Sequence, residues 1–407
     1  MTSTLDLTSY GDFDPGRLSR LDRLLADYVD DGRLAGWELA ITQHDDVVHT
    51  GHYGWRDRES GVPVDGKTVW RIASMTKPVT SVAAMTLWEE GGFGLMDPIS
   101  TWIPEFADVR VYQKGTAKEP FTVPVREPIR VWHLLSHSSG LTAGFLHTHV
   151  VDQLYRDAGY EWGAPPDRNL ADCVDDWARL PLRFEPGTAW GYGVSTDVLG
   201  RLIEIWTGQR LDEAIATRVT EPLGMHDTTF HADEALAERM PAVYYPDPQT
   251  GRAVPNPMFQ NNGRVKPTVF SGGGGLLSTV DDYSRFARML VNDGQFDGTR
   301  LLAPATVQLM RRNHLPGDLD ELSTGGFAET TLEGIGFGLG FATVVSPTRA
   351  HSVSSEGEFY WGGAFSTVFW VDPVRDITCT FMAQLFPSST YPLRAQLRQL
   401  VYAALTP

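Results

Sequence analysis

The chain has 407 residues, 42% of them hydrophobic and 21% charged, a composition typical of a folded protein whose length suits roughly two to three domains. Its 51 acidic and 34 basic residues give a net charge of −17, which disfavours binding to nucleic-acid phosphates and to anionic lipid. Two cysteines are too few for a disulfide framework or for a cysteine-based zinc site.

The sequence carries no targeting or membrane signal that we recognise. Met1 to Asp6 lack the basic and apolar stretches of a secretory signal. No segment approaches the ~18 unbroken apolar residues of a membrane span. We therefore expect a cytoplasmic protein that binds neither membrane nor nucleic acid, and the sequence leaves its oligomeric state open.

Helical and strand-like patterns alternate in the N-terminal part of the chain. After Asp14-Pro15, apolar residues recur at helical spacing and predict an amphipathic helix. Residues 37–42 and 47–53 are typical of two strands joined by a polar turn. A helix is predicted over 76–90 and ends at Gly91-Gly92. The apolar positions are Leu18, Leu21, Leu25 and Val29 in the first helix and Val79, Val82, Ala83 and Leu87 in the second.

The middle and the end of the chain differ in texture. From about residue 95 to 190 strand patterns thin out and short helical patterns dominate, so we predict a helical insertion there. Strands at both ends of the chain around a helical middle predict an α+β protein whose sheet is completed by the C-terminus, with a closing helix after Pro392. The predicted helices between these ends are 129–136, 168–179, 196–206, 211–219 and 279–292, and the predicted late strands are 336–343, 358–362, 366–371 and 377–383.

Ser74-Met75-Thr76-Lys77 is the first segment that could carry chemistry. Residues three apart share one face of a helix, so Ser74 and Lys77 can form a nucleophile and its activating base. A lysine acts as a base only when neutral, and burial of the apolar helix that follows disfavours the charged form. The alternative is an exposed helix start in which Ser74 or Thr76 serves as the N-cap.

Two further segments place aromatic residues among glycines. Tyr192 lies between Gly191 and Gly193, and these small neighbours let its hydroxyl approach another part of the chain, although a packed core tyrosine fits equally well. Gly362-Gly363 interrupts a strand pattern, as glycines do where a ligand or another backbone comes close. A backbone N–H at this point could stabilise an oxyanion, and the alternative is a bulge or a tight bend.

Several familiar motifs are incomplete. His133 and His137 lack the glutamate of the zincin pattern His-Glu-x-x-His, so we expect no metal. His147 and His149 are expected at the surface or lining a pocket. No Gly-x-Ser-x-Gly occurs, which excludes an α/β-hydrolase nucleophile elbow. The run 272–275 of four glycines lacks the Gly-Lys-Ser/Thr ending of a P-loop, so no nucleotide cofactor is expected.

Seven segments, taken in order, resemble the serine β-lactamase and penicillin-binding-protein superfamily. Within it, the chain is similar to the class C β-lactamase-like esterases known as family VIII carboxylesterases. The resemblance covers about residues 14 to 405. The segments are Arg71–Lys77, Leu134–Leu141, Phe184–Gly187, Tyr192 with Asp197–Gly200, Glu221–Met225, Ser271–Asp281 and Trp361–Gly363.

The resemblance implies a fold and its division. The fold would be α+β and β-lactamase/transpeptidase-like, an antiparallel sheet flanked by helices with a second, mostly helical subdomain. We predict that residues 1–85 and 195–407 form the α/β subdomain and residues 86–194 the helical one. The active site would lie between them and would need no cofactor.

The resemblance also implies roles for particular residues. Ser74 matches the acylated nucleophile, Lys77 its partner base, and Tyr192 the family tyrosine that moves protons with the lysine. The backbone N–H groups of Ser74 and Ala364 would form the oxyanion hole.

Departures from the class C pattern bear on the substrate. The asparagine of the β-lactamase motif Tyr-x-Asn is replaced by Val194, and the motif Lys-Thr-Gly by Trp361-Gly362-Gly363. The substrate pocket formed by these residues thereby loses a cation suited to the β-lactam carboxylate and an amide suited to its acylamino group. The pattern favours neutral, apolar acyl groups.

We therefore expect a serine hydrolase that cleaves short- to medium-chain carboxylic esters through an acyl-enzyme, with a small-molecule ester as its partner. An acyltransferase using the same acyl-enzyme is the alternative, followed by a β-lactamase or D-amino-acid peptidase. A scaffold that only binds acyl ligands is disfavoured by the intact Ser74, Lys77 and Tyr192.

Overall fold

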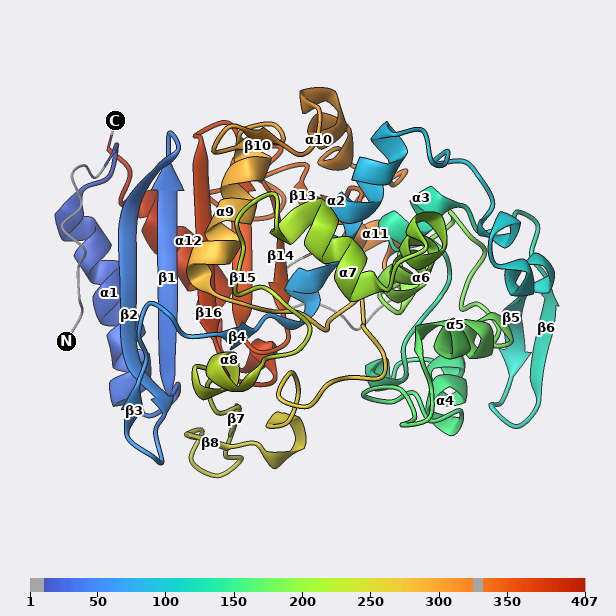
Figure 1. Ribbon diagram of the computed structural model, residues 1–407, viewed down its shortest axis with the longest axis horizontal. Helices are drawn as coiled ribbons and strands as arrows, with labels where there is room; N and C mark the ends of the chain where they lie inside the picture. Colours follow the sequence, from blue (N-terminus) through green and yellow to red (C-terminus); the bar gives the residue numbers. More distant parts are fainter. Residues whose placement is uncertain (1–10, 325–331, 407) are drawn as a thin grey trace.

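The computed structural model describes residues 11–324 and 332–406 (Figure 1). Residues 1–6, on which the expectation of no secretory signal rests, lie outside this range, as do the parts 1–10, 325–331 and 407 of the predicted α/β subdomain. Within the described ranges, none of the helices combines the length and the apolar composition that crossing a bilayer requires.

An eight-stranded sheet, antiparallel throughout, dominates the described residues (Figure 1). The N-terminal strand β1 lies between β2 and the late strand β16, with Trp37 opposite Ala383 and Gln43 opposite Ile377. The C-terminus therefore completes the sheet, as the sequence predicts. In sheet order the strands are β12 (Ile335–Phe337), β13 (Ala342–Val344), β14 (Phe359–Gly363), β15 (Thr367–Asp372), β16 (Ile377–Ala383), β1 (Gly36–Gln43), β2 (Asp46–Asp57) and β3 (Val62–Pro63).

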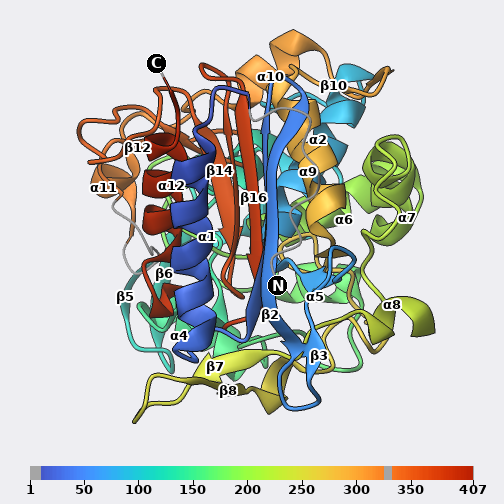
Figure 2. The same cartoon turned by 90° about the vertical axis from the view of Figure 1, so that its left-hand side faces the viewer.

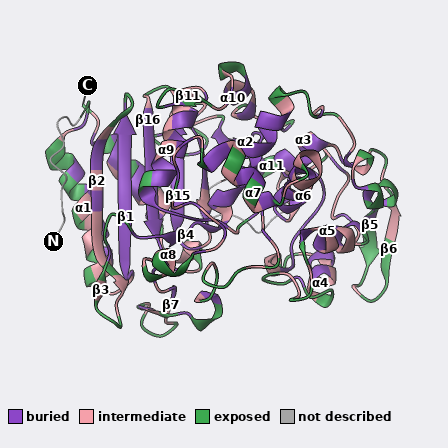
Figure 3. Ribbon diagram, viewed as in Figure 1, coloured by how far each residue is buried: buried purple, intermediate pink, exposed green. Residues whose placement is uncertain are grey.

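Helices cover both faces of this sheet. α1 (Pro15–Asp30) and α12 (Leu393–Ala403) lie side by side on one face, and α9 (Val280–Val291) packs on the other (Figure 2). Leu18, Leu21 and Leu25 of α1 are buried, whereas Val29 is only half-buried and its neighbour Tyr28 takes the core position. Burial on both faces explains why every residue of β1 is buried (Figure 3).

The start of α1 follows from its first residues. The Asp14 side chain accepts a hydrogen bond from the Arg17 N–H at 2.9 Å, and Pro15 occupies the first turn, where it has no N–H to leave unpaired.

The remaining helices lie mainly at the end of the sheet near β14 and beyond it (Figure 1). They are α2 (Thr76–Glu89), α3 (Val131–Leu135), α4 (Val150–Asp157), α5 (Leu170–Ala178), α6 (Ser195–Thr207), α7 (Leu211–Ile215), α8 (Glu234–Glu238), α10 (Pro304–Met310) and α11 (Leu319–Leu322). α2 packs against α6, which itself contacts α3, α5 and α7. The described chain thus has an α+β architecture with a region rich in short helices beside the sheet. The limits of the two proposed subdomains stay a prediction.

Within the part of the chain that the structure describes, four short strand pairs lie outside the main sheet, and one of them departs from the prediction. β5 (Arg110–Gly115) and β6 (Pro120–Pro124) form a hairpin inside the segment predicted to be a helical insertion. Val111 of β5 is buried and bridges to Leu182, so tertiary packing holds the hairpin. The other pairs are β4 (Trp70–Arg71) with β9 (Leu277–Ser278), β7 (Tyr244–Pro246) with β8 (Ala253–Pro255), and β10 (Gln295–Phe296) with β11 (Thr299–Arg300).

Two further predictions need correction. The single strand predicted over 336–343 is a hairpin of β12 and β13, because the chain turns at Gly340, whose φ of +102° lies in the region that favours glycine. The helix predicted over 211–219 is the short α7 followed by a π-helical turn, Ala216–Thr220.

Candidate active site

A short turn presents Ser74. Residues Ala73–Met75 form a 3₁₀ turn that runs directly into α2. Ala73 has a φ of +45°, a costly conformation for a residue with a Cβ, and such strain is frequent at functional sites. Thr76 holds the turn, since its Oγ1 donates to the Ala73 carbonyl at 2.7 Å and accepts from the Leu276 N–H at 3.0 Å. The N-cap of α2 is Met75 and Thr76 is buried, so the alternative of an exposed, hydroxyl-capped helix start is wrong.

Two donors converge on the Ser74 hydroxyl. Tyr192 Oη donates to Ser74 Oγ at 2.6 Å, and Lys77 Nζ donates to the same oxygen at 3.3 Å. Lys77 and Tyr192 are 5% and 4% exposed, whereas Ser74 is half-buried. The structure therefore brings three of the residues singled out from the sequence to one point, with the hydroxyl as the accessible member.

Nζ of Lys77 has a second partner, which no sequence motif indicates. Nζ donates to the Gly273 carbonyl at 2.6 Å. Asp197 fixes this carbonyl, because its Oδ1 accepts from the Gly273 N–H at 3.1 Å and from Ser271 Oγ at 2.5 Å. A Cβ at position 273 would lie 2.4 Å from Asp197 Oδ2, so only glycine fits. The glycine run set aside as an incomplete P-loop is thus a support of the lysine.

Aromatic rings surround Tyr192. Lys77 Nζ lies 4.5 Å from the centroid of its ring, a cation–π distance, and the His137 ring lies 5.1 Å away. Burial, with a smaller effect of the nearby Lys77, lowers the pKa of His137 well below its ordinary value and keeps the imidazole neutral. Gly193 lets the loop approach Thr142, whose backbone would be 2.6 Å from a Cβ at position 193. The small neighbours of Tyr192 therefore serve a close approach, as one of the two interpretations expects.

The end of β14 lies against the turn that carries Ser74. A Cβ at Gly363 would lie 2.2 Å from the Ile72 carbonyl oxygen, and Ala364 follows directly. Gly362 pairs with Val368 and Gly363 with Thr367 in regular register, so the glycines mark a close approach and the alternative of a bulge is wrong. A Cβ at Gly362 would meet the Arg394 guanidinium at 2.3 Å; Arg394 also donates to the Gly363 carbonyl at 3.0 Å.

The two remaining residues of the predicted substrate pocket are Trp361 and Val194. Trp361 lies on β14, and Val194 follows Tyr192 by two residues along the chain. The Trp361 ring is 5.8 Å from the Tyr192 ring and 5.3 Å from the Phe337 ring. Val194 is the N-cap of α6, and its N–H donates to the Thr142 carbonyl at 3.3 Å. Neither side chain brings a charge to the surroundings of Ser74.

The histidines considered as metal ligands have other environments. His133 Nδ1 accepts from the Arg130 N–H at 3.0 Å, and burial lowers the pKa of this imidazole to about 4. His147 is exposed beside Glu161 at 3.0 Å, and His149 accepts from the Val151 N–H at the start of α4. Over residues 11–324 and 332–406, no group of three or more His, Cys, Asp and Glu side chains is placed to hold a metal ion.

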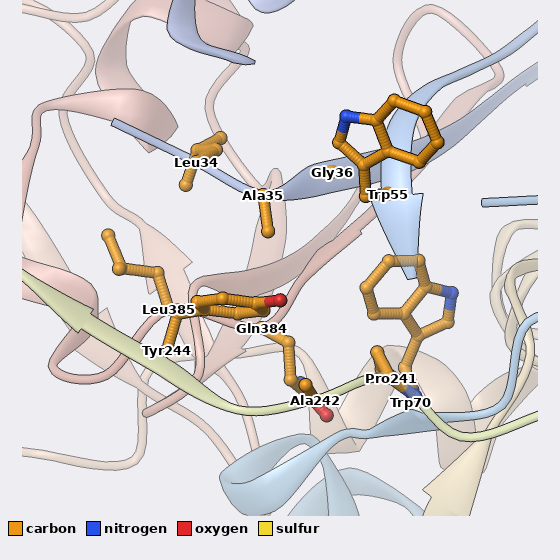
Figure 4. A pocket seen from close by; sticks show the side chains of 10 residues that line it. All are labelled: Leu34, Ala35, Gly36, Trp55, Trp70, Pro241, Ala242, Tyr244, Gln384 and Leu385. Carbon is orange, nitrogen blue, oxygen red and sulfur yellow. The ribbon is translucent and has the colours of Figure 1, made fainter. Parts of the chain in front are cut away.

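A small cavity lies behind the segment that leads to Ser74 (Figure 4). Its volume is about 10 Å³, and Trp55, Trp70 and Gln384 are among the residues that line it. Gln384 also accepts from the Arg71 N–H at 3.0 Å and so joins the cavity wall to the segment before the turn. The volume suits a single water molecule and is far too small for a substrate.

The arrangement defines the class of protein. The hydroxyl of Ser74 accepts hydrogen bonds from a lysine and a tyrosine. Residues 21–403 of the chain match the Beta-lactamase family model. The chain belongs to the Beta-lactamase family. It has the β-lactamase/transpeptidase-like fold and is an enzyme of the serine β-lactamase superfamily, with the acyl-enzyme chemistry that this superfamily uses.

Individual relatives cover nearly the whole chain. Protein Rv1367c of Mycobacterium tuberculosis is 35% identical over 89% of both chains. Esterase EstB of Burkholderia gladioli is 29% identical over 98% of this chain and 99% of its own. Among solved structures, EstCE1, a hydrolase with promiscuous acyltransferase activity, superposes with a TM-score of 0.81 at 26% identity and covers 97% of this chain and 100% of its own. The predicted family VIII-like resemblance is thereby confirmed.

Proposed function

We propose that this protein is a carboxylesterase that cleaves short- to medium-chain esters of small molecules through an acyl-enzyme on Ser74. The observation that carries the proposal is the convergence of Tyr192 Oη and Lys77 Nζ on Ser74 Oγ, at 2.6 and 3.3 Å. The similarity to Esterase EstB supports the choice of an ester as substrate.

In the first half-reaction, Ser74 Oγ forms a bond to the carbonyl carbon of the ester and loses its proton to the Lys77–Tyr192 pair, whose deprotonated member, a neutral lysine or a tyrosinate, acts as the base. The carbonyl oxygen becomes an oxyanion, which the N–H groups of Ser74 and Ala364 stabilise. The bond to the alcohol oxygen then breaks, and the alcohol leaves with the proton from Tyr192.

In the second half-reaction, water takes the place of the alcohol. It gives one proton to the Lys77–Tyr192 pair and adds to the acyl carbon, and Ser74 Oγ leaves with that proton. The Gly273 carbonyl holds Lys77 in position through both steps. The acyl group lies against the Trp361 indole, an apolar wall that suits a neutral chain.

An acyltransferase is the second candidate, in which an alcohol intercepts the acyl-enzyme in place of water. The many aromatic rings around Tyr192 and the promiscuous acyltransferase activity of EstCE1 favour it. β-Lactam hydrolysis is disfavoured because Trp361 brings no positive charge to a carboxylate and Val194 brings no side-chain amide to an acylamino group.

Rapid mixing with p-nitrophenyl butanoate tests the proposal. We expect p-nitrophenol release in wild type and none above background in Ser74→Ala. Adding 1-butanol and measuring butyl butanoate separates transfer from hydrolysis. Equal release by wild type and Ser74→Ala would contradict the proposal.

A further inference from the structure

Five aromatic side chains connect the surroundings of Tyr192 with those of Ala364, and the reaction described above does not use them. We call them the aromatic arc: Phe145, Trp162, Phe259, Phe365 and Phe386. Phe145 lies 6.4 Å from the Tyr192 ring and stacks on Trp162 at 5.7 Å and 17°. Trp162 in turn meets Phe386 at 5.6 Å and Phe259 at 6.0 Å, edge to face.

The Phe145–Trp162 pair is built into the fold. Gly144 packs so closely on the next segment that a Cβ would lie 2.3 Å from the Tyr160 carbonyl oxygen. The Arg156 guanidinium donates to the Gly144 carbonyl at 2.6 Å, and Tyr160 Oη donates to Asp176 at 2.6 Å. These contacts fix the two backbone segments and hence the two rings that they carry.

The other half of the arc adjoins the turn of the nucleophile. Phe259 and Phe365 are buried in one small cluster with Ala73, and Ala364 and Phe386 pack against it. The rings of Phe259 and Phe365 lie 5.6 Å apart, and the ring of Phe259 lies 4.8 Å from that of Phe386. The arc therefore begins beside the tyrosine that handles protons and ends beside the residue whose N–H faces the oxyanion.

Exposure distinguishes Trp162 from the rest of the arc. It is 47% exposed although three rings contact it, whereas Phe259 and Phe365 are each 7% exposed. A tryptophan whose role is only to pack between two segments would be largely buried. Here nearly half of the tryptophan is left accessible to a ligand.

Proton transfer from Tyr192 brings the alcohol part of the ester close to this residue. The alcohol oxygen must lie within hydrogen-bond distance of Tyr192 Oη to take its proton. The rings of Phe145 and Trp361 both lie beside the Tyr192 ring, at 6.4 and 5.8 Å, and each offers an apolar surface to one group of the ester.

We propose that Phe145 and Trp162 form the binding surface for the alcohol group of the ester and select apolar, preferably aromatic, alcohols. The inference rests on the proposed esterase function and divides its site into an acyl side at Trp361 and an alcohol side at Trp162. In transfer reactions the acceptor alcohol occupies the same surface, since it approaches the acyl carbon by the path that the first alcohol leaves.

Two series of esters test this division. The first series compares ethyl butanoate with benzyl butanoate, so that only the alcohol group changes. The second compares methyl acetate with methyl hexanoate, so that only the acyl group changes. Acid release in a pH-stat gives kcat/KM for each. For Trp162→Ala we expect the benzyl-to-ethyl ratio to fall about tenfold, the scale of losing one apolar contact surface, with the hexanoate-to-acetate ratio unchanged. Trp162→Phe should restore most of the benzyl preference.

A matched control and the contrary outcomes complete the test. Trp55 is 41% exposed on β2 and lies outside the arc, so Trp55→Ala should change neither ratio. A Trp162→Ala enzyme that keeps its benzyl preference, or changes only its acyl preference, would overturn the alcohol surface while leaving the esterase intact. If wild type hydrolyses none of these esters, the proposed function itself fails.

Discussion

Two buried polar clusters on opposite sides of β14 use similar side chains in different ways. On the side of Trp361, Tyr192 and Lys77 meet at the half-buried hydroxyl of Ser74. On the side of Tyr360, Tyr402 Oη lies 2.5 Å from Glu358 and 2.6 Å from Asp372. Side chains alternate along a strand, which explains why neighbouring residues of β14 serve separate clusters.

The cluster around Tyr402 neutralises its own charges. Arg398 Nε lies 2.9 Å from Glu358 Oε1, and neither Glu358 nor Asp372 is exposed. Burial raises the pKa of Glu358, whereas the Arg398 guanidinium and the Tyr402 hydroxyl act in the opposite direction by favouring the ionised carboxylate.

The cluster around Ser74 holds its amine with uncharged oxygens. Nζ of Lys77 donates to the carbonyl of Gly273 and to the hydroxyl of Ser74. Charged side chains that pair with one another thus mark a structural cluster, whereas an amine held by a carbonyl beside an accessible hydroxyl marks a reactive one.

Removing the proton-transfer residues should have the largest effect. Lys77→Ala and Tyr192→Phe should each lower kcat by roughly three powers of ten with p-nitrophenyl butanoate, because proton transfer to and from Ser74 is lost. The double variant should be little worse than the poorer single one, since residues that act as a unit are not additive. Losses that multiply would contradict a shared role. Lys77→Arg should also fail, because arginine stays charged.

Breaking the other cluster should alter stability and spare catalysis. Arg398→Met should lower the free energy of unfolding by about 3 kcal/mol or more in urea titrations, because Glu358 loses its buried partner. Turnover of the folded variant should persist. The control is Arg375→Met, whose guanidinium is half exposed and 4.0 Å from Asp372, with an expected change within about 0.5 kcal/mol. If the Arg398→Met enzyme folds but loses turnover, the cluster around Tyr402 is required for catalysis and the separation of the two clusters is wrong.

Trp361 should decide between esters and β-lactams. The wild type should turn over p-nitrophenyl butanoate roughly 10²-fold better, in kcat/KM, than a cephalosporin whose carboxylate stays unpaired. Trp361→Lys should narrow this gap, although Val194 still withholds a polar contact. Equal kcat/KM values in the wild type would refute the apolar acyl side.

Glu38 is another buried carboxyl, and its ionisation makes the stability of the fold depend on pH. Burial raises the pKa of Glu38 from 4.5 to about 8, and its oxygen accepts from Trp70 Nε1 at 2.9 Å. The folded protein keeps a proton that the unfolded chain releases, so this stability is complete below pH 4.5 and is lost as pH rises towards 8.

Glu38→Gln cannot ionise and should lose less stability on alkalinisation. Between pH 6 and pH 8, its free energy of unfolding should fall about 2 kcal/mol less than that of wild type. Glu234→Gln at an exposed position should follow the wild-type curve. Parallel curves for wild type and Glu38→Gln would show that Glu38 is already ionised in the folded protein.

Local patterns were sufficient to predict much of the fold and the centre of the site. Periodicity predicts α1, α2 and the last three strands, β14 to β16, and short motifs single out Ser74, Lys77 and Tyr192. The hairpin β5–β6 was not predicted, because its strands of six and five residues depend on the bridge from Val111 to Leu182.

Contacts made by backbone atoms or between distant segments had no such signal. The support of Lys77 is the carbonyl of Gly273, and a carbonyl belongs to every residue alike. Phe145 and Trp162 meet only because Gly144 packs against Tyr160, which the sequence does not display.

The most direct test of the Ser74 nucleophile is covalent labelling with a p-nitrophenyl alkylphosphonate, followed by mass spectrometry of the digested protein. The geometry around Ser74 predicts one phosphonyl group per chain, on the peptide that contains Ser74, with release of one p-nitrophenol. Ser74→Ala should remain unlabelled while melting at the wild-type temperature. A phosphonyl group on any other serine, or undiminished labelling of Ser74→Ala, would contradict the assignment of the nucleophile.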